Sequence, residues 1–111
     1  MNNLKLRSRQ WIVNEKGQMV MGEGRMRILK TIDRTGSINK TAKLLRMSYK
    51  AVWSKIKATE SHLNFRLVQA DGRRGSRVTE AGKDLLQKYT LLKEQCVEAD
   101  DQIFREIFQQ P

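Results

Sequence analysis

The sequence is nearly empty of cysteine, histidine and proline, with one of each among 111 residues. Cys96 has no second cysteine for an internal disulfide, and His62 has no Cys or His neighbour at a spacing that suggests zinc. The ordinary expectation for Cys96 is a small, buried apolar residue. His62 is expected at the surface or facing phosphate, since no nucleophile with an orienting partner is recognisable near it. We expect no disulfide framework, metal site or cofactor.

The sequence also lacks the local motifs of common enzymes and of membrane proteins. It contains no P-loop, no Rossmann glycine pattern and no paired-carboxylate motif. No run of about eighteen apolar residues could span a bilayer, and the N-terminus carries charges where a signal peptide needs an apolar core. The expectation is a soluble, cytoplasmic protein that is not an enzyme.

What the sequence has in excess is positive charge. Its formal net charge is +10, which favours a polyanionic partner such as nucleic acid or an anionic membrane surface. Residues 1–90 hold twenty lysines and arginines against seven acids, or +13, whereas residues 91–111 hold two against five, or −3. Phosphate would repel the acidic end, so we expect that end to contact protein instead.

The most informative pattern is a pair of short helices joined by a tight turn within residues 35–56. A helix over residues 25–34 precedes it, and Gly36 is placed to end that helix in the left-handed conformation. Ser37 can cap the next helix by accepting a bond from a free backbone N–H. The expected core-facing stripes are Ile28, Leu29 and Ile32 on the first helix, and Ile38, Ala42 and Leu45 on the second.

The third helix is expected to begin after Ser48 as its cap and to end near Asn64. At 100° per residue, one arc should pack on the body: Tyr49, Val52, Ile56, Thr59 and Leu63. The opposite arc presents Lys50, Ser54 and Lys57, which could enter a major groove and bond base edges. Trp53 lies at the edge, either as a half-buried wedge or against a sugar or thymine methyl. The alternative for the lysines is an ordinary solvated face.

A basic hairpin follows the third helix. Residues 66–70 suit a short strand, residues 71–76 a glycine-bracketed loop and residues 77–79 a returning strand. Arg73 and Arg74 at the tip could reach phosphate or a narrow minor groove, as the wing of a winged helix does. The alternative is a generic basic hairpin tip.

The N-terminal segment alternates between apolar and basic residues. Residues 4–13 and 18–21, separated by a turn at 14–17, predict a β-hairpin. The alternative is a basic arm that places Lys5, Arg7 and Arg9 on phosphate.

The last segment, residues 80–111, predicts a long helix that starts after Thr79 as its cap. Its apolar positions repeat at alternating steps of four and three, and they are Leu85, Tyr89, Leu92, Cys96, Ala99 and Ile103. This seam favours a dimer with Cys96 near the two-fold axis, because a small body has little surface to cover so long a helix. The alternative is packing back on its own domain.

Several of these motifs together resemble the N-terminal winged-helix domain of the molybdate-responsive ModE regulators. The likeness covers roughly residues 20–90. It rests on Gly22-Glu23-Gly24-Arg25, Thr35-Gly36-Ser37-Ile38, Ala42-Lys43, Ser48-Tyr49-Lys50 followed by Trp53, Leu67-Val68 before the glycine-rich wing, and Thr79-Glu80-Ala81-Gly82. The LysR-type regulators share the helix-turn-helix, the wing and the Thr-Glu-Ala-Gly start, and are a more distant resemblance. The likeness implies a dimeric transcription factor.

One departure from that pattern concerns the ligand. The ModE regulators bind molybdate or tungstate in a C-terminal domain, for which this sequence has no counterpart up to Pro111. We therefore expect no molybdate site within residues 1–111, and sensing by the usual route is not expected.

The combined expectation is a mainly helical fold with a little β-structure. Residues 1–79 would form a winged helix-turn-helix domain with an N-terminal β-hairpin, and residues 80–111 a dimerisation helix. A homodimer would bind a two-fold symmetric site on double-stranded DNA and regulate transcription. The expected DNA contacts are Ser37, Lys40, Ser48, Lys50, Trp53, Ser54, Lys57, Arg73, Arg74 and Arg77. The alternatives are a nucleoid-type protein without sequence preference and a protein-interaction module that has lost DNA binding.

Overall fold

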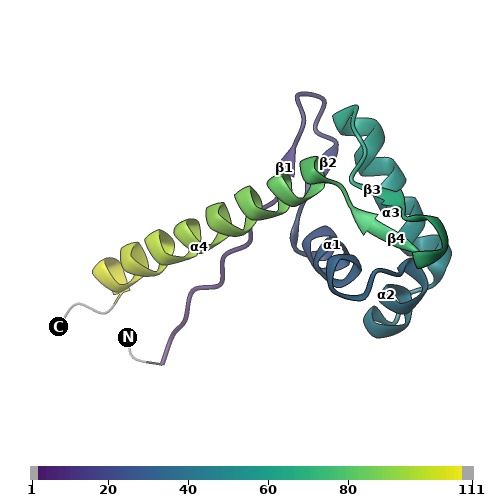
Figure 1. The fold of residues 1–111 in the computed structure, drawn as a ribbon. Helices are drawn as coiled ribbons and strands as arrows, with labels where there is room; N and C mark the ends of the chain where they lie inside the picture. Colours follow the sequence, from purple (N-terminus) through teal and green to yellow (C-terminus); the bar gives the residue numbers. More distant parts are fainter. Residues whose placement is uncertain (1–2, 109–111) are drawn as a thin grey trace.

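The computed structural model describes residues 3–108, and for Arg74 the backbone alone. In these residues helices α1 to α3 and two small hairpins form a body, from which the long helix α4 projects (Figure 1). In chain order the elements are β1 (Ile12–Val13), β2 (Met19–Met21), α1 (Glu23–Thr35), α2 (Ile38–Leu45), α3 (Tyr49–Leu63), β3 (Val68–Ala70), the 3-10 turn η1 (Gly72–Arg74), β4 (Ser76–Val78) and α4 (Glu80–Phe108). The predicted mainly helical fold with small β-hairpins is confirmed.

The helix boundaries follow the predicted capping residues. Gly36 ends α1 in the left-handed region, with φ of 71°. Three hydroxyls each accept a backbone N–H at 3.0 Å and so cap α2, α3 and α4: Ser37 from Lys40, Ser48 from Ala51 and Thr79 from Gly82. These bonds pair donors that the first turn of each helix would otherwise leave without a partner.

The core lies where the three helices of the body meet the inner edges of both hairpins. Ile28, Leu29 and Ile32 of α1 are buried as predicted, and Ala42 is the buried residue of the α2 stripe. The rest of the core consists of Met26 of α1 and of residues from the following parts of the chain and from β2: Val20, Met21, Val52, Ile56, Leu67, Val68, Val78, Leu86 and Tyr89. Burying one aliphatic side chain of this size stabilises the fold by about 1.5–3 kcal/mol, so this cluster fixes how the helices are placed.

Tyr49 departs from its predicted burial. Val52, Ile56 and Thr59 are buried, but the Tyr49 side chain is 51% exposed. Tyr49 lies at the edge of the buried arc and is the first residue of α3. At this end of α3 the body does not cover the whole arc that the helical wheel predicts to be buried.

The N-terminal hairpin is shorter than predicted. Strand β1 covers only Ile12–Val13 and pairs with β2 across a bulge, with Gly17 N–H donating to the Asn14 carbonyl at 2.9 Å in the turn. Residues 3–11, called the arm below, form no strand and run beside α4 (Figure 1). The alternation in the arm therefore has no strand partner, because β2 is only three residues long.

Helix α4 has a packed root and a projecting end. Gly82, Leu86 and Tyr89 are buried against the body, and Lys93 forms an ion pair with Glu23 of α1 at 3.1 Å. The rest of the helix extends away from the body (Figure 1), and the molecule measures 61 × 31 × 21 Å along its principal axes. The only neighbour that Figure 1 shows along this projecting half is the arm, within the described residues.

The surroundings of two helical glycines, Gly82 and Gly24, predict opposite effects of a Gly→Ala substitution on stability. A Cβ at Gly82 would lie 2.7 Å from the Leu67 carbonyl oxygen and 2.8 Å from Val78 Cγ1, whereas a Cβ at Gly24 meets nothing within 4 Å. Gly82→Ala should lower the free energy of unfolding by about 1–3 kcal/mol through overpacking. Gly24→Ala should leave it unchanged or raise it by up to about 1 kcal/mol. Urea unfolding measures both; equal stability of the two variants would contradict the close packing of α4 on the wing.

Candidate nucleic-acid interface

The first part of the candidate interface is the N-terminus of α2. The Ser37 hydroxyl oxygen accepts the Lys40 N–H, and its own hydrogen stays available to a ligand. Lys40 is exposed on the first turn. A helix N-terminus with a hydroxyl and a lysine suits a phosphate, because the helix dipole and the backbone N–H groups favour negative charge there.

The second part is the outer face of α3. Lys50, Ser54 and Lys57 are all exposed, on the side opposite Val52, Ile56 and Thr59. The predicted separation into a buried set and a presented set therefore holds for these six residues. Lysine and serine side chains on an exposed helix can donate to guanine O6 and N7 in a major groove.

Trp53 lies at the border of this face. Its side chain is 45% exposed, and the Lys57 ammonium lies 5.6 Å from the centre of its ring. This cation–π contact holds the lysine over the indole. Trp53 is thus half-packed in the protein and retains exposed surface beside the lysines.

The third part is the wing, formed by β3, η1 and β4. Its strands pair in the register Val68 with Val78, Gln69 with Arg77 and Ala70 with Ser76. Arg73 and Arg77 are exposed. The side chain of Arg74 lies outside the part that the structure describes, so its predicted role stays a prediction.

A backbone contact fixes the wing against the turn between α1 and α2. The Ser76 N–H donates to the Gly36 carbonyl at 2.9 Å. Gly75 next to it has φ of 104°, and a Cβ there would collide with the same carbonyl. Glycine is therefore needed at this crossing. Strand β4 thus begins beside the start of α2, and Figure 1 shows both at the end of the body away from α4.

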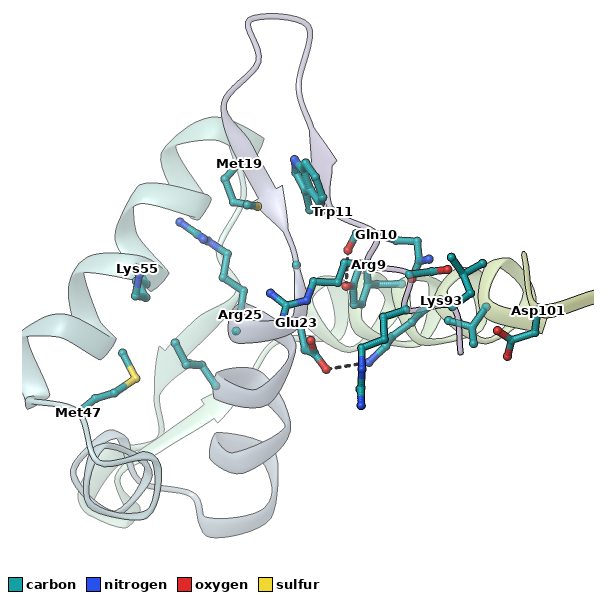
Figure 2. Close-up of a pocket in the computed structure, with 18 residues that line it drawn as sticks. Arg9, Gln10, Trp11, Met19, Glu23, Arg25, Met47, Lys55, Lys93 and Asp101 are labelled. Carbon is teal, nitrogen blue, oxygen red and sulfur yellow. Dashed lines mark hydrogen bonds and ion pairs between the residues drawn. The ribbon is translucent and has the colours of Figure 1, made fainter. Parts of the chain in front are cut away.

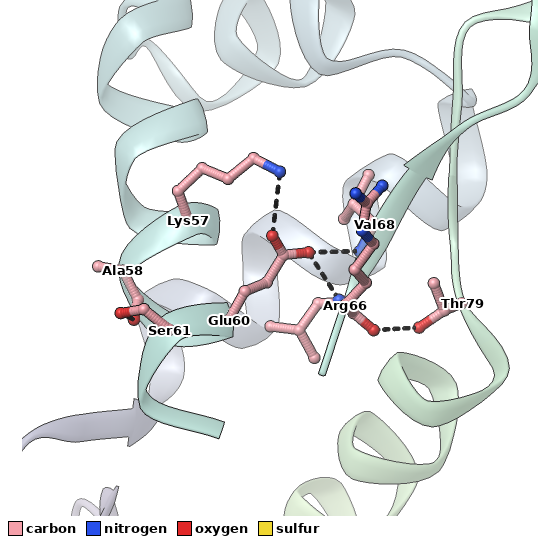
Figure 3. Close-up of polar contacts among 8 residues, drawn as sticks. Lys57, Ala58, Glu60, Ser61, Arg66, Val68 and Thr79 are labelled. Carbon is pink, nitrogen blue, oxygen red and sulfur yellow. Dashed lines mark hydrogen bonds and ion pairs between the residues drawn. The ribbon is translucent and has the colours of Figure 1, made fainter. Parts of the chain in front are cut away.

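Glu60 makes a second connection, between α3 and the wing (Figure 3). Its Oε2 accepts the N–H groups of Leu67 and Val68 at 2.7 and 3.2 Å, and its Oε1 accepts from Lys57 Nζ at 3.1 Å. The Glu60 side chain is 10% exposed. Glu60 was not singled out from the sequence, because its partners lie seven and eight residues away and no local motif marks them.

The surroundings of Glu60 act on its pKa in opposite directions. Burial, the largest single influence, raises the pKa of this carboxyl. The bonds from the two wing N–H groups and from Lys57 together outweigh burial, so the pKa lies below its ordinary value. The carboxylate is thus ionised at neutral pH and serves as an acceptor for the wing.

The remaining cations of the interface are free of carboxylates within the described part of the chain. The recorded ion pairs there involve Lys57, Lys83, Lys88 and Lys93. Lys40, Lys50, Arg73 and Arg77 take part in none of them. Unneutralised cations of this kind are what a phosphate backbone attracts.

His62 and the acidic residues form no candidate metal-binding group in residues 3–108. No group of three His, Cys, Asp or Glu side chains there could hold a metal ion. His62 Nδ1 lies 2.8 Å from the Met19 carbonyl, which only accepts, so this nitrogen donates and ties α3 to β2. His62 is half-buried in this structural role.

A cavity of about 650 Å³ lies between the arm, the start of α1, α3 and α4. Figure 2 shows Arg9, Arg25 and Lys55 around it, with the Lys93–Glu23 ion pair on one wall. Arg25 Nε donates to the Thr59 hydroxyl at 2.6 Å, which links α1 to α3. Burial lowers the pKa of Arg25 below its ordinary value.

The residues of the predicted dimer seam fall into two groups. Tyr89 is 1% exposed and donates its hydroxyl to the Gln10 carbonyl at 2.6 Å, so it belongs to the core of its own protomer and not to an open seam. Leu92, Ala99 and Ile103 are exposed, and Leu85 and Cys96 are half-buried.

Within residues 3–108, no helix is both long and apolar enough to cross a membrane.

Comparison with known sequences supports both resemblances. Residues 24–83 match the family described as bacterial regulatory helix-turn-helix protein, lysR family. The molybdenum transport protein ModE of Azotobacter vinelandii is 33% identical over 87 residues, or 75% of this chain and 32% of that protein. The transcriptional regulator ModE of Yersinia pestis is 39% identical over 72 residues, or 61% and 27%. The chain thus matches between about a quarter and a third of the length of these relatives.

Solved structures support the winged-helix fold. The CbnR_DBD–DNA complex superimposes with a TM-score of 0.63 at 21% identity, over 78% of this chain and 99% of that one, and shows the same fold. Full-length LysG from Corynebacterium glutamicum with bound effector Arg gives a TM-score of 0.59 at 27% identity, over 82% of this chain and 31% of that one.

The Glu60 contacts predict a pH-dependent stability. Because the folded pKa of Glu60 is lowered, its stabilisation is fully present above the unfolded value of about 4.5 and is lost as pH falls through the folded pKa. Glu60→Gln should lower the free energy of unfolding by about 1–2 kcal/mol at pH 7, and the deficit should shrink toward about pH 3. Unfolding by urea across this range measures it. Glu94→Gln, an exposed control, should match wild type; a deficit that is independent of pH would contradict the role of the Glu60 charge.

Proposed function

The chain belongs to the bacterial regulatory helix-turn-helix proteins of the lysR family, and we propose that it binds duplex DNA as a homodimer and regulates transcription. The observation that carries the proposal is the outer face of α3. Val52, Ile56 and Thr59 are buried and fix the helix, so that Lys50 and Lys57 face outward. The names of its relatives, one of them a transcriptional regulator, support the regulatory role.

In this proposal α3 lies in the major groove and reads base edges. Lys50, Ser54 and Lys57 supply the hydrogen-bond donors, and Ser48 lies at the N-terminal end of the helix. The exposed part of Trp53 packs on sugar or on a thymine methyl, steadied by the contact of its ring with Lys57. These contacts would determine the sequence preference.

Contacts to the phosphate backbone would come from two neighbouring groups outside α3. Ser37 and Lys40 supply them from the start of α2, and Arg73, Arg74 and Arg77 from the wing. The Gly36–Ser76 hydrogen bond holds these two groups at a fixed spacing. Such contacts set the position on the duplex and most of the salt dependence, and they carry little sequence information.

The dimer face in this proposal is the exposed apolar stripe of α4. Leu92, Cys96, Ala99 and Ile103 repeat at steps of four, three and four, with half-buried Leu85 one turn before Tyr89. Two such stripes pair about a two-fold axis near Cys96. A symmetric dimer would place two α3 helices one DNA turn apart, about 34 Å, or a multiple of it, and would select a two-fold symmetric site.

Two substitutions separate base reading from phosphate binding. Lys50→Ala should relax the preference for the selected site over random duplex, with a loss of about 1–3 kcal/mol confined to the specific site. Arg73→Ala should weaken all duplexes alike and reduce the slope of log affinity against log salt by about one. Fluorescence anisotropy with selected and random duplexes measures both.

Arg105→Ala, on α4 away from the wing, is the control and should change neither quantity. A wild-type specificity ratio near one would favour a nucleoid-type coating protein. Affinity that does not vary with salt would sink DNA binding itself.

The dimer face predicts a separate outcome. The double variant Leu92→Ser/Ile103→Ser removes two exposed apolar side chains from the stripe and should convert the dimer to a monomer, since neither residue belongs to the core. Sedimentation equilibrium measures the mass. Leu91→Ser changes an exposed neighbour on another face of the helix and should leave the dimer intact. Equal effects of the two changes would place the interface elsewhere.

A further inference from the structure

The cavity of Figure 2 is large enough for a small molecule, and cations outnumber acids on its walls. Its volume of about 650 Å³ lies within the range of about 300–1,000 Å³ that is usual for ligand pockets. Two acids line it, Glu23 and Asp101. The cations that line it are Arg7, Arg9, Arg25, Lys55 and Lys93. A cleft lined mainly by charges of one sign attracts a ligand of the opposite sign.

Arg25 is a half-buried cation that joins no ion pair recorded among residues 3–108. Its Nε donates to the Thr59 hydroxyl at 2.6 Å, and the terminal N–H groups of the guanidinium have no recorded acceptor in that part of the chain. Burial lowers the pKa of Arg25, because the removal of water disfavours its charged form. An anion in the cavity would offset this cost and accept from the terminal N–H groups.

Lys55 is a second such cation, and it lies next to the first. It is exposed and takes part in none of the ion pairs recorded for residues 3–108. Lys55 and Arg25 together line this cavity and also a small pocket between α1 and α3, so their side chains are neighbours. Figure 2 shows Arg25 reaching from the start of α1 toward α3, which carries Lys55. Two neighbouring cations repel each other, and an anion bound by both replaces that repulsion with attraction.

The first turn of α1 adds backbone donors to the same cavity. Gly22, Glu23, Gly24 and Arg25 all line it. Gly22 is the N-cap residue and no side chain caps this helix, whereas hydroxyls cap α2, α3 and α4. The N–H groups of this first turn are therefore without a side-chain acceptor, and the helix dipole favours negative charge there. The helix start thus supports the same kind of ligand as the two cations do.

The arm contributes a polar atom and an aromatic ring to the opposite wall (Figure 2). Gln10 Oε1 is buried and has no hydrogen-bond partner within residues 3–108. Buried polar atoms are nearly always paired, and a ligand hydroxyl can donate to this one. Trp11 is 61% exposed and lies beside the start of α1, because a Cβ at Gly22 would be 3.4 Å from Trp11 Cβ. The indole offers a surface on which a ring of the ligand can pack.

We propose that this cavity binds a small organic phosphate. Arg25, Lys55 and the first-turn N–H groups of α1 hold the phosphate, and the organic part lies against Trp11 and Gln10. The excess of cations favours a phosphate over a carboxylate, because a phosphate monoester carries up to two negative charges and three acceptor oxygens. The inference goes beyond the proposed function, and it requires neither a dimer nor the outer face of α3.

A phosphate of the DNA backbone is a poorer occupant than a small molecule. Lys55 follows Lys50 by five residues and so lies about 140° away around α3, off the face that is proposed to meet DNA. Glu23 and Asp101 in the lining would repel the further phosphates of a duplex. A ligand with one phosphate can instead place its whole charge at Arg25.

The test is the binding of adenosine monophosphate, which combines a phosphate, hydroxyls and an aromatic ring. Isothermal titration calorimetry on the full chain at low salt should show saturable binding. Adenosine, which lacks the phosphate, and inorganic phosphate, which lacks the ring, should each bind at least about tenfold more weakly. Arg25→Gln should weaken the binding of adenosine monophosphate at least about tenfold, because a charged donor is lost. Arg27→Gln, on the same helix but outside the cavity, is the matched control and should bind as wild type does.

A second variant covers the structural role of Arg25. Arg25 also donates to Thr59, so Arg25→Gln can lower stability for that reason alone. Lys55→Gln keeps this bond and changes an exposed side chain. It should retain the wild-type unfolding temperature and weaken the binding of adenosine monophosphate by about threefold.

Trp11 reports on the position of the organic part. The chain has two tryptophans, so Trp11 is the remaining one in Trp53→Phe. Adenosine monophosphate should change the fluorescence of this variant with the dissociation constant found by calorimetry. Unchanged fluorescence at saturation would overturn the placement of the ring on Trp11.

The outcomes separate this inference from the proposed function. Absence of saturable binding of adenosine monophosphate to the wild-type chain would overturn the inference and leave DNA binding untouched. Equal affinities of Arg25→Gln, Arg27→Gln and wild type would exclude this cavity as the site. Loss of duplex affinity in Lys55→Gln with unchanged affinity for adenosine monophosphate would identify this wall as a DNA contact instead. A chain that binds adenosine monophosphate as described but no duplex would support the inference and contradict the proposed function.

Discussion

The rotation of α3 about its own axis is the constraint on which the rest of the interface depends. Three side chains set it: Val52 and Thr59 are 0% and 1% exposed, and Ile56 packs between them. The Thr59 hydroxyl also accepts from Arg25 of α1 at 2.6 Å, so the contact has direction as well as apolar area. A rotation that turned Lys50 inward would bury an unpaired ammonium, which costs more than burying an isoleucine stabilises. The buried face of α3 therefore determines which of its residues are presented on the outer face.

A fixed helix is useful only if the wing keeps its place beside it. Two polar contacts do this, the Ser76 N–H on the Gly36 carbonyl and the Glu60 carboxylate on the N–H groups that open β3. The net charge of +10 favours the ionised form of an acidic side chain such as Glu60. Glu60 also forms an ion pair with Lys57. Burial removes water from this carboxylate, which costs free energy. The three hydrogen bonds that it accepts replace the lost hydration and offset that cost.

The features that could be predicted from the sequence are those encoded within a few residues. The caps at Ser37, Ser48 and Thr79 and the left-handed Gly36 each depend on a bond or a conformation that spans one turn. The wing follows from its glycines in the same way. Long-range partners have no such signature: the bond between Gln10 and Tyr89 joins residues 79 apart, and Glu60 reaches into the following strand. Tyr89 has the spacing of the predicted seam, yet it is buried against its own body. Periodicity predicts which residues share one face of a helix, but it does not predict what packs on that face.

The projection of α4 separates the acidic C-terminal part of the chain from its basic body. Its 29 residues extend about 43 Å at 1.5 Å per residue, whereas surface charges are screened over about 8–10 Å at physiological salt. The acids near its end are therefore electrostatically separate from the cations of α3 and the wing, which retain their attraction for phosphate. At the far end the same acids lie beside the basic arm, where they act on neighbours only. Helix α4 thus keeps the acidic end of a strongly basic chain apart from the cations of α3 and the wing.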